Sequence, residues 1–142
     1  MTTLTDNKNN SLNLAFDSID SCFGYIDYIT SKIHQLLAFY NSGEIDRANS
    51  TLVELIDLMD LYIQLVTKIY QVLRSDLKEK KFKTNDVQEL EMHLLTVLKA
   101  LLQAREKEDI IMLCDLLEYE LIDNLIQWKI KILPELKKLK GL

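Results

Sequence analysis

The chain is poor in the residues that interrupt helices and build irregular folds. It contains 3 Gly, 1 Pro and 2 Cys among 142 residues. So few Gly and Pro exclude a turn-rich β-sandwich, and two cysteines are too few for a disulfide scaffold. Leu and Ile together supply 41 residues, which excludes a disordered chain. The composition therefore predicts one helical domain.

The chain also lacks a surplus of positive charge. It has 22 acidic and 17 basic residues, with a net charge of −5, whereas a domain that binds duplex nucleic acid normally carries a basic surface. The last fourteen residues are an exception, with five Lys against one Glu. Because cations are favoured at the C-terminal end of a helix, this local surplus predicts a helix end and no nucleic-acid partner.

Features of secretion or membrane insertion are missing as well. The first ten residues show no basic segment leading into an apolar run, so we expect no signal peptide. No uncharged apolar stretch approaches the roughly 18 residues needed to span a membrane. Cys22 and Cys114 both fall on apolar helix stripes and are expected to be small buried hydrophobic residues in a reducing compartment. These observations predict a cytoplasmic protein.

Apolar residues recur in alternating steps of three and four along four segments, which is the pattern of amphipathic helices. The first helix is expected over residues 12–40, and the second begins near Ile45 after the Asn41-Ser42-Gly43 stop. The charged run 78–84 breaks the pattern and is expected to be an exposed crossover. The third helix begins at Asn85, and the fourth begins near Asp109 after a tight turn. The expected fold is an all-α, antiparallel up-down four-helix bundle built from two helical hairpins.

The two ends of the chain are expected to lie outside this bundle. Residues 1–10 are polar and without periodicity, so they predict a disordered N-terminal tail, and the single bundle domain covers residues 11–133. The apolar positions of the fourth helix are spaced by 3, 4, 4, 3 and 4 from Cys114 to Ile132. Pro134 should kink or end that helix, leaving residues 134–142 as a loosely held basic tail.

The clearest candidates for chemistry are paired carboxylates. His34 and His93 lack the Glu-x-x-His spacing of di-iron bundles, and the three glycines cannot build a phosphate-binding loop. Each of two acidic pairs, by contrast, lies three residues apart on a helix and so shares one face. The pairs are Glu54 with Asp57, and Glu120 with Asp123. All-α nucleotide pyrophosphatases bind magnesium with such pairs, so a magnesium-dependent hydrolase is the alternative function.

A surplus of apolar residues outside the main stripes is the more informative feature. Ile122, Ile126, Ile130 and Leu133, spaced by 4, 4 and 3, form a second ridge on the fourth helix, and Tyr119 lies beside it. Other apolar residues expected on outward faces are Tyr28, Leu61 and Leu102. Monomers rarely expose large apolar patches, so the ridge predicts a protein partner or self-association as a homodimer, unless a twisted bundle or a tail covers it. The expected function is therefore a non-enzymatic, adaptor- or chaperone-like helical bundle that needs no cofactor.

Two segments carry a resemblance to known proteins. They are residues 40–56, with the run YNSGEIDRA leading into LVELI, and residues 104–121, with the run DLLEYEL. They resemble small helical proteins of Gram-positive bacteria and, more loosely, the flagellar secretion chaperones, which shield the amphipathic ends of flagellar subunits. The likeness covers about half of the chain and implies a cytoplasmic helical bundle. The N-terminal Tyr/Asn and Thr-x-x-Ser-Pro features of those chaperones are missing here, so no binding residue is carried over.

Overall fold

The computed structural model describes residues 4–77 and 85–141, and the regular structure within these ranges is helical. Three long helices come first: α1 (Leu4–Asn41), α2 (Ile45–Asp76) and α3 (Asn85–Glu106). The rest, residues 110–141, is one unbroken helical run that we call the C-terminal helix. Its parts are α4 (Ile110–Asp115), the π-helical turn η2 (Leu116–Leu121), α5 (Ile122–Gln127), the π-helical turn η3 (Trp128–Ile132), α6 (Leu133–Lys138) and the 3₁₀ turn η4 (Leu139–Gly141).

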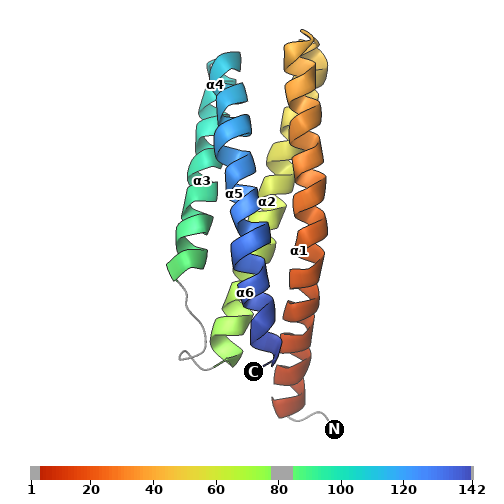
Figure 1. Ribbon diagram of the computed structural model, residues 1–142, viewed down its shortest axis with the longest axis vertical. Coiled ribbons are helices and arrows are strands. Elements are labelled where there is room, and N and C mark those ends of the chain that lie inside the picture. Colours follow the sequence, from red (N-terminus) through yellow and green to blue (C-terminus); the bar gives the residue numbers. More distant parts are fainter. Residues whose placement is uncertain (1–3, 78–84, 142) are drawn as a thin grey trace.

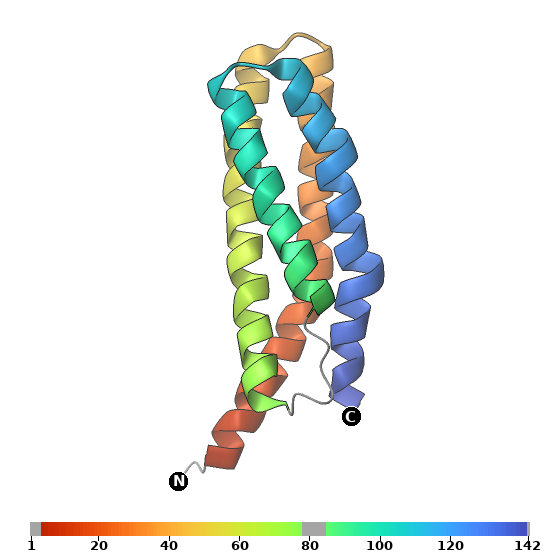
Figure 2. The same cartoon turned by 90° about the vertical axis from the view of Figure 1, so that its left-hand side faces the viewer.

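These helices form a four-helix bundle, which confirms the predicted all-α fold. Figure 1 shows α1 beside α2 and α3 beside the C-terminal helix, with successive helices running in opposite directions. The turns within the two hairpins lie at the same end of the bundle, and the C-terminus lies at the other (Figure 2). The predicted crossover between the hairpins, residues 78–84, lies outside the described residues.

Local chemistry explains where the two hairpins turn. Gly43 has a φ of 76°, a left-handed conformation that costs glycine little, and the N–H of Glu44 donates to the Phe39 carbonyl at 2.9 Å. At the second turn, the Asp109 side chain caps the next helix by accepting from the N–H of Met112 at 3.0 Å. The predicted helix starts near Ile45 and Asp109 are confirmed.

The core consists of the apolar stripes that the spacing predicts. On α1 the buried positions recur in steps of three and four from Ala15 to Tyr40, and on α2 they do so from Ala48 to Leu73. Cys22 is fully buried, whereas Leu12, Leu90 and Cys114 are half-buried at the edges of their stripes. Each hairpin therefore buries one face against the other.

The π-turns keep the C-terminal helix in register with this core. Its buried apolar stripe consists of Leu113, Leu117, Leu121, Leu125, Trp128, Ile132 and Leu136, with Asn124 and Leu133 buried beside it. From the first to the last of them the spacing averages about 3.8 residues per turn, more than the 3.6 of an α-helix, so a regular helix would rotate its stripe out of the core. Each π-turn absorbs part of this excess, because its hydrogen bonds span five residues instead of four. The N–H of Ile122 donates to the Leu117 carbonyl in η2, and the N–H of Leu133 donates to the Trp128 carbonyl in η3.

The predicted C-terminal tail is wrong. The helix continues beyond Pro134, and Leu136 is buried against α1. Proline is tolerated here because it lies in the first turn of α6, one residue after η3, where the N–H of Leu133 bonds the carbonyl of Trp128 in place of that of Lys129. An ion pair between Lys137 and Asp20, at 2.8 Å, holds the same segment to α1.

The predicted N-terminal boundary is also wrong in part. Helix α1 begins at Leu4, so residues 4–10 continue the helix that was expected to begin after them, and residues 1–3 lie outside the described part of the chain. Polar residues do not stop a helix that is already nucleated, because propagation costs far less than nucleation.

Candidate functional site

The predicted ridge on the C-terminal helix is exposed. Tyr119 is 66% exposed, Ile126 45% and Ile130 65%, while Ile122 is half-buried and packs against the core. The π-turns that hold the buried stripe inward also keep the opposite face of the helix outward. In the described part of the chain, neither the C-terminal segment nor the twist of the bundle covers these three side chains. Leu133 was expected on the same ridge, and this prediction is wrong, because Leu133 is 1% exposed and belongs to the core.

A second apolar surface lies between α1 and α2. It is a groove of about 320 Å³, to which α1 contributes two tyrosines and an isoleucine. The lining residues are Tyr25, Tyr28, Ile29, Leu58, Leu61, Tyr62 and Leu65. The sequence predicts the exposure of Tyr28 and Leu61, and both are more than half exposed. It does not predict the groove, although the three leucines, spaced by three and four, form a second stripe on α2 that could have indicated it.

An ion pair lies beside Tyr28, one of the residues that line the groove. Lys32 of α1 donates to Glu54 of α2 at 2.9 Å, and the Lys32 nitrogen lies 5.8 Å from the centre of the Tyr28 ring. The hydrogen bond to Glu54 raises the pKa of the Lys32 ammonium, which therefore stays charged. A cation at this distance over a ring is attracted to the π-system, so Lys32 orients both Tyr28 and Glu54.

The floor of the groove connects to the centre of the core. Tyr62 lines the groove and meets Trp128 edge to face, with ring centroids 5.7 Å apart. The Tyr62 hydroxyl and the Trp128 indole N–H are both buried without a hydrogen-bond partner in the structure. Burial raises the pKa of Tyr62 far above its ordinary value and that of the Cys22 thiol to about 12. Both groups therefore stay neutral at physiological pH.

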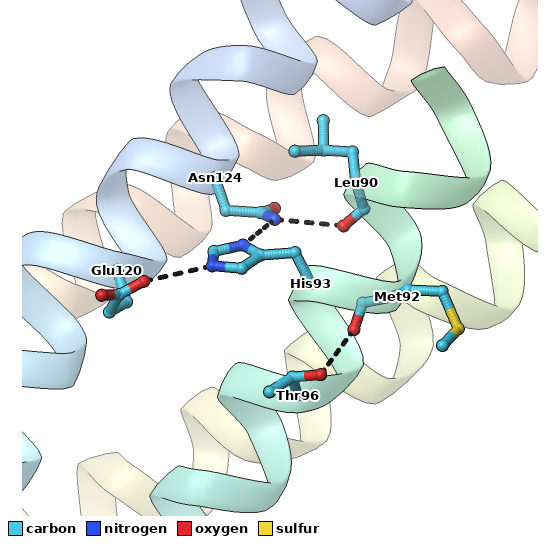
Figure 3. A network of polar contacts seen from close by, with 6 residues as sticks. All are labelled: Leu90, Met92, His93, Thr96, Glu120 and Asn124. Atoms are coloured by element: carbon cyan, nitrogen blue, oxygen red, sulfur yellow. Dashed lines mark hydrogen bonds and ion pairs between the residues drawn. The ribbon is translucent and has the colours of Figure 1, made fainter. Parts of the chain in front are cut away.

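A polar network joins α3 to the C-terminal helix (Figure 3). The amide of Asn124, a residue only 1% exposed, donates to the Leu90 carbonyl at 3.1 Å and lies 2.9 Å from His93 Nδ1. His93 Nε2 lies 3.1 Å from the Glu120 carboxylate. Because the amide nitrogen can only donate, His93 Nδ1 accepts and Nε2–H donates to Glu120. The network fixes how the two helices align, much as a buried Asn fixes the register of a coiled coil.

The hydroxyl drawn beside the network in Figure 3 is engaged within its own helix. Thr96 donates to the Met92 carbonyl at 2.9 Å. The role of Asn124 could not be predicted from the sequence, because an amide on a helix acquires such a role only through the helix that packs against it.

The structure does not bring the two predicted carboxylate pairs together. Glu54 pairs with Lys32 and Glu120 with His93, so each pair has one member engaged with a different helix. Within residues 4–77 and 85–141, no three His, Cys, Asp or Glu side chains gather where they could hold a metal ion. The hydrolase alternative thus lacks a shared magnesium site in the described part of the chain. In the same part, no helix has the length and apolar character required to cross a membrane.

Comparison with known proteins places the chain in a family. A family model described as a domain of unknown function, DUF8042, matches residues 17–131. The chain belongs to this family. The matched span includes the ridge, the groove and the polar network, so all three belong to the DUF8042 domain. The search of curated proteins and the search of solved structures each gave no match.

Proposed function

We propose that this DUF8042 protein is a non-enzymatic helical bundle that binds another protein, or itself, through helix packing. The exposed ridge carries this proposal. Tyr119, Ile126 and Ile130 lie along one outward face, and large apolar side chains gathered on a surface are typical of protein contacts. An adaptor or chaperone-like role in the cytoplasm, as the sequence indicates, is part of the proposal.

The geometry of the ridge suits a helical partner. From Tyr119 to Ile130 it extends about 16 Å, or three helical turns. A partner helix with apolar residues at positions i, i+3 or i+4, and i+7 would match this length and lay them across the ridge. Exposed charges differ at its two ends, with Glu118 and Asp123 near Tyr119, and Lys131 near Ile130. A partner helix with basic residues at one end and acidic residues at the other would therefore bind in a defined direction.

A pair of matched substitutions tests the proposal. Ile126→Asp places a charge in the middle of the ridge, and Leu102→Asp places one on α3 at a side chain of nearly equal exposure, 43% against 45%. Both variants should retain the helical circular dichroism of the wild type, since both side chains already face water. Size exclusion with light scattering measures self-association, and affinity capture followed by titration of the purified partner measures binding to another protein.

The expected result is that Ile126→Asp abolishes an association that Leu102→Asp retains. If the wild type and both variants behave alike in both assays, with the same hydrodynamic radius and the same captured proteins, the ridge does not bind protein and the proposal is wrong.

A further inference from the structure

The residues on the outer stripe of α2 are arranged symmetrically about its midpoint, with charges of opposite sign at the two ends. It reads Glu54, Leu58, Leu61, Leu65 and Lys68, in steps of four, three, four and three. Leu61 is the midpoint, is 61% exposed, and lies seven residues from the acid on one side and from the base on the other. Read from either end, the stripe is a charged residue, three leucines and a residue of opposite charge.

This order makes the stripe complementary to a second copy of itself. If two α2 helices pack antiparallel with Leu61 opposite Leu61, Glu54 of each lies opposite Lys68 of the other, since seven residues correspond to about 10.5 Å on both sides. We propose that the α1–α2 face binds a second copy of this chain in this way, as a two-fold symmetric dimer centred on Leu61. Such an interface is isologous, so each charge match occurs twice.

Helix α1 contributes two tyrosines near the centre of the proposed interface. The ion pair between Lys32 and Glu54 places these residues at one level, and seven residues further along each helix Tyr25 stands level with Leu61. Tyr25 and Tyr28 are each about half exposed at the rim of the groove. Tyrosine combines a large apolar ring with a polar edge and is enriched in protein interfaces, so the two rings would widen the leucine contact.

Charge selects the register in which a second copy binds. Residues 1–77 contain ten acidic and five basic residues, so two such hairpins repel each other in most registers. The antiparallel register offsets part of this repulsion, because it brings each Glu54 opposite an exposed Lys68 that makes no ion pair with a described residue. Glu54 is itself 60% exposed and could hold both Lys32 and the second copy's lysine.

The first test compares two exposed apolar residues. Leu61→Asp should convert the full chain from dimer to monomer in analytical ultracentrifugation, while Met92→Asp on α3, 65% exposed, should leave the dimer intact. A Leu61→Cys variant should form an intermolecular disulfide on mild oxidation, because only residues on the two-fold axis meet their own copy, and Met92→Cys should not. A wild-type chain that is monomeric at every concentration, or a Leu61→Asp variant that still dimerises, overturns the proposal.

The second test determines the register. Glu54→Lys should weaken the dimer about tenfold or more, because two attractive pairs become two repulsions. Adding Lys68→Glu to it should restore the affinity, since the swapped charges match again. If the double variant stays as weak as Glu54→Lys, the antiparallel α2 pairing is wrong.

The dimer proposal does not rest on the ridge, and the two can fail separately. If Ile126→Asp rather than Leu61→Asp abolishes the dimer, the ridge is the self-association surface. That outcome overturns this inference and supports the proposed function.

Discussion

The same substitution, Gly→Ala, should have opposite effects at two positions of the α1–α2 hairpin. Gly24 lies inside α1 and is exposed, and a Cβ added there would meet nothing within 4 Å. Gly43 ends the turn after α1 with a φ of 76°. Both positions are open in space, so steric clash with a neighbour plays no part at either, and the backbone alone decides the sign.

The magnitudes follow from helix propensity and from the left-handed backbone. Alanine is favoured over glycine in a helix interior by about 1 kcal/mol, so Gly24→Ala should raise the free energy of unfolding by about that amount. At Gly43 a left-handed alanine costs about 1 to 2 kcal/mol, offset by up to about 1 kcal/mol from the stiffer unfolded chain, so Gly43→Ala should lower the free energy of unfolding by about 1 kcal/mol. At about 3 °C for each kcal/mol, the two midpoints should differ by roughly 6 °C.

Thermal and urea unfolding, followed by circular dichroism at a low fixed protein concentration, measures both values. A Gly24→Ala variant that is less stable than the wild type would mean that the position needs glycine, which contradicts the open helix surface seen there. A Gly43→Ala variant as stable as the wild type would mean that the turn can change its conformation without cost, and the C-cap assigned to Gly43 would be wrong.

Three further predictions concern the buried groups. A thiol reagent at pH 8 should label half-buried Cys114 slowly and fully buried Cys22 only after unfolding, because burial raises the pKa of both thiols. Burial raises the pKa of the Cys22 thiol from about 9 in the unfolded chain to about 12 in the folded chain, so its contribution to stability is complete below pH 9 and is lost as the pH rises toward 12. Urea unfolding should therefore give a free energy of unfolding that is about 1 kcal/mol lower at pH 10 than at pH 8. This difference should be smaller in Cys22→Ala. Asn124→Leu should lower the free energy of unfolding in urea by about 1 kcal/mol, because it removes both bonds that the amide donates but also an unpaired buried carbonyl oxygen. Asn124→Ala should lose about 2 kcal/mol more, because it also leaves a cavity. A Leu variant as stable as the wild type would show that the amide bonds contribute nothing to stability.

Most of the fold could be predicted because each helix has a continuous apolar stripe. On α1 the positions from Ile19 to Leu36 recur without a break, and the spacing alone is enough to identify all of them as core residues. Start and stop signals are similarly local. Gly43 and Asp109 act through bonds to atoms within five residues, so their roles are already determined by the sequence around them.

The errors arise where an outcome depends on a second element. Pro134 normally ends a helix, and it fails to do so here because a π-turn precedes it and because α1 offers a surface that buries Leu136. Asn124 is an ordinary polar residue until α3 brings the Leu90 carbonyl and His93 within hydrogen-bonding distance. The groove was not predicted for the same reason, since the apolar pattern of α2 alone does not reveal how much of it α1 covers.

The ridge and the groove share no residue, so one of them can bind a partner while the other stays exposed. The groove belongs to α1 and α2, and the ridge belongs to the C-terminal helix, so a dimer formed through Leu61 would leave both copies of Ile126 and Ile130 exposed. Such a dimer presents two identical ridges on one rigid body. A partner that carries two matching helices would then bind both at once, and its second contact would form at the high effective concentration set by the dimer. A partner with a single helix would gain nothing from dimerisation, so Leu61→Asp should weaken the binding of the two-helix partner alone.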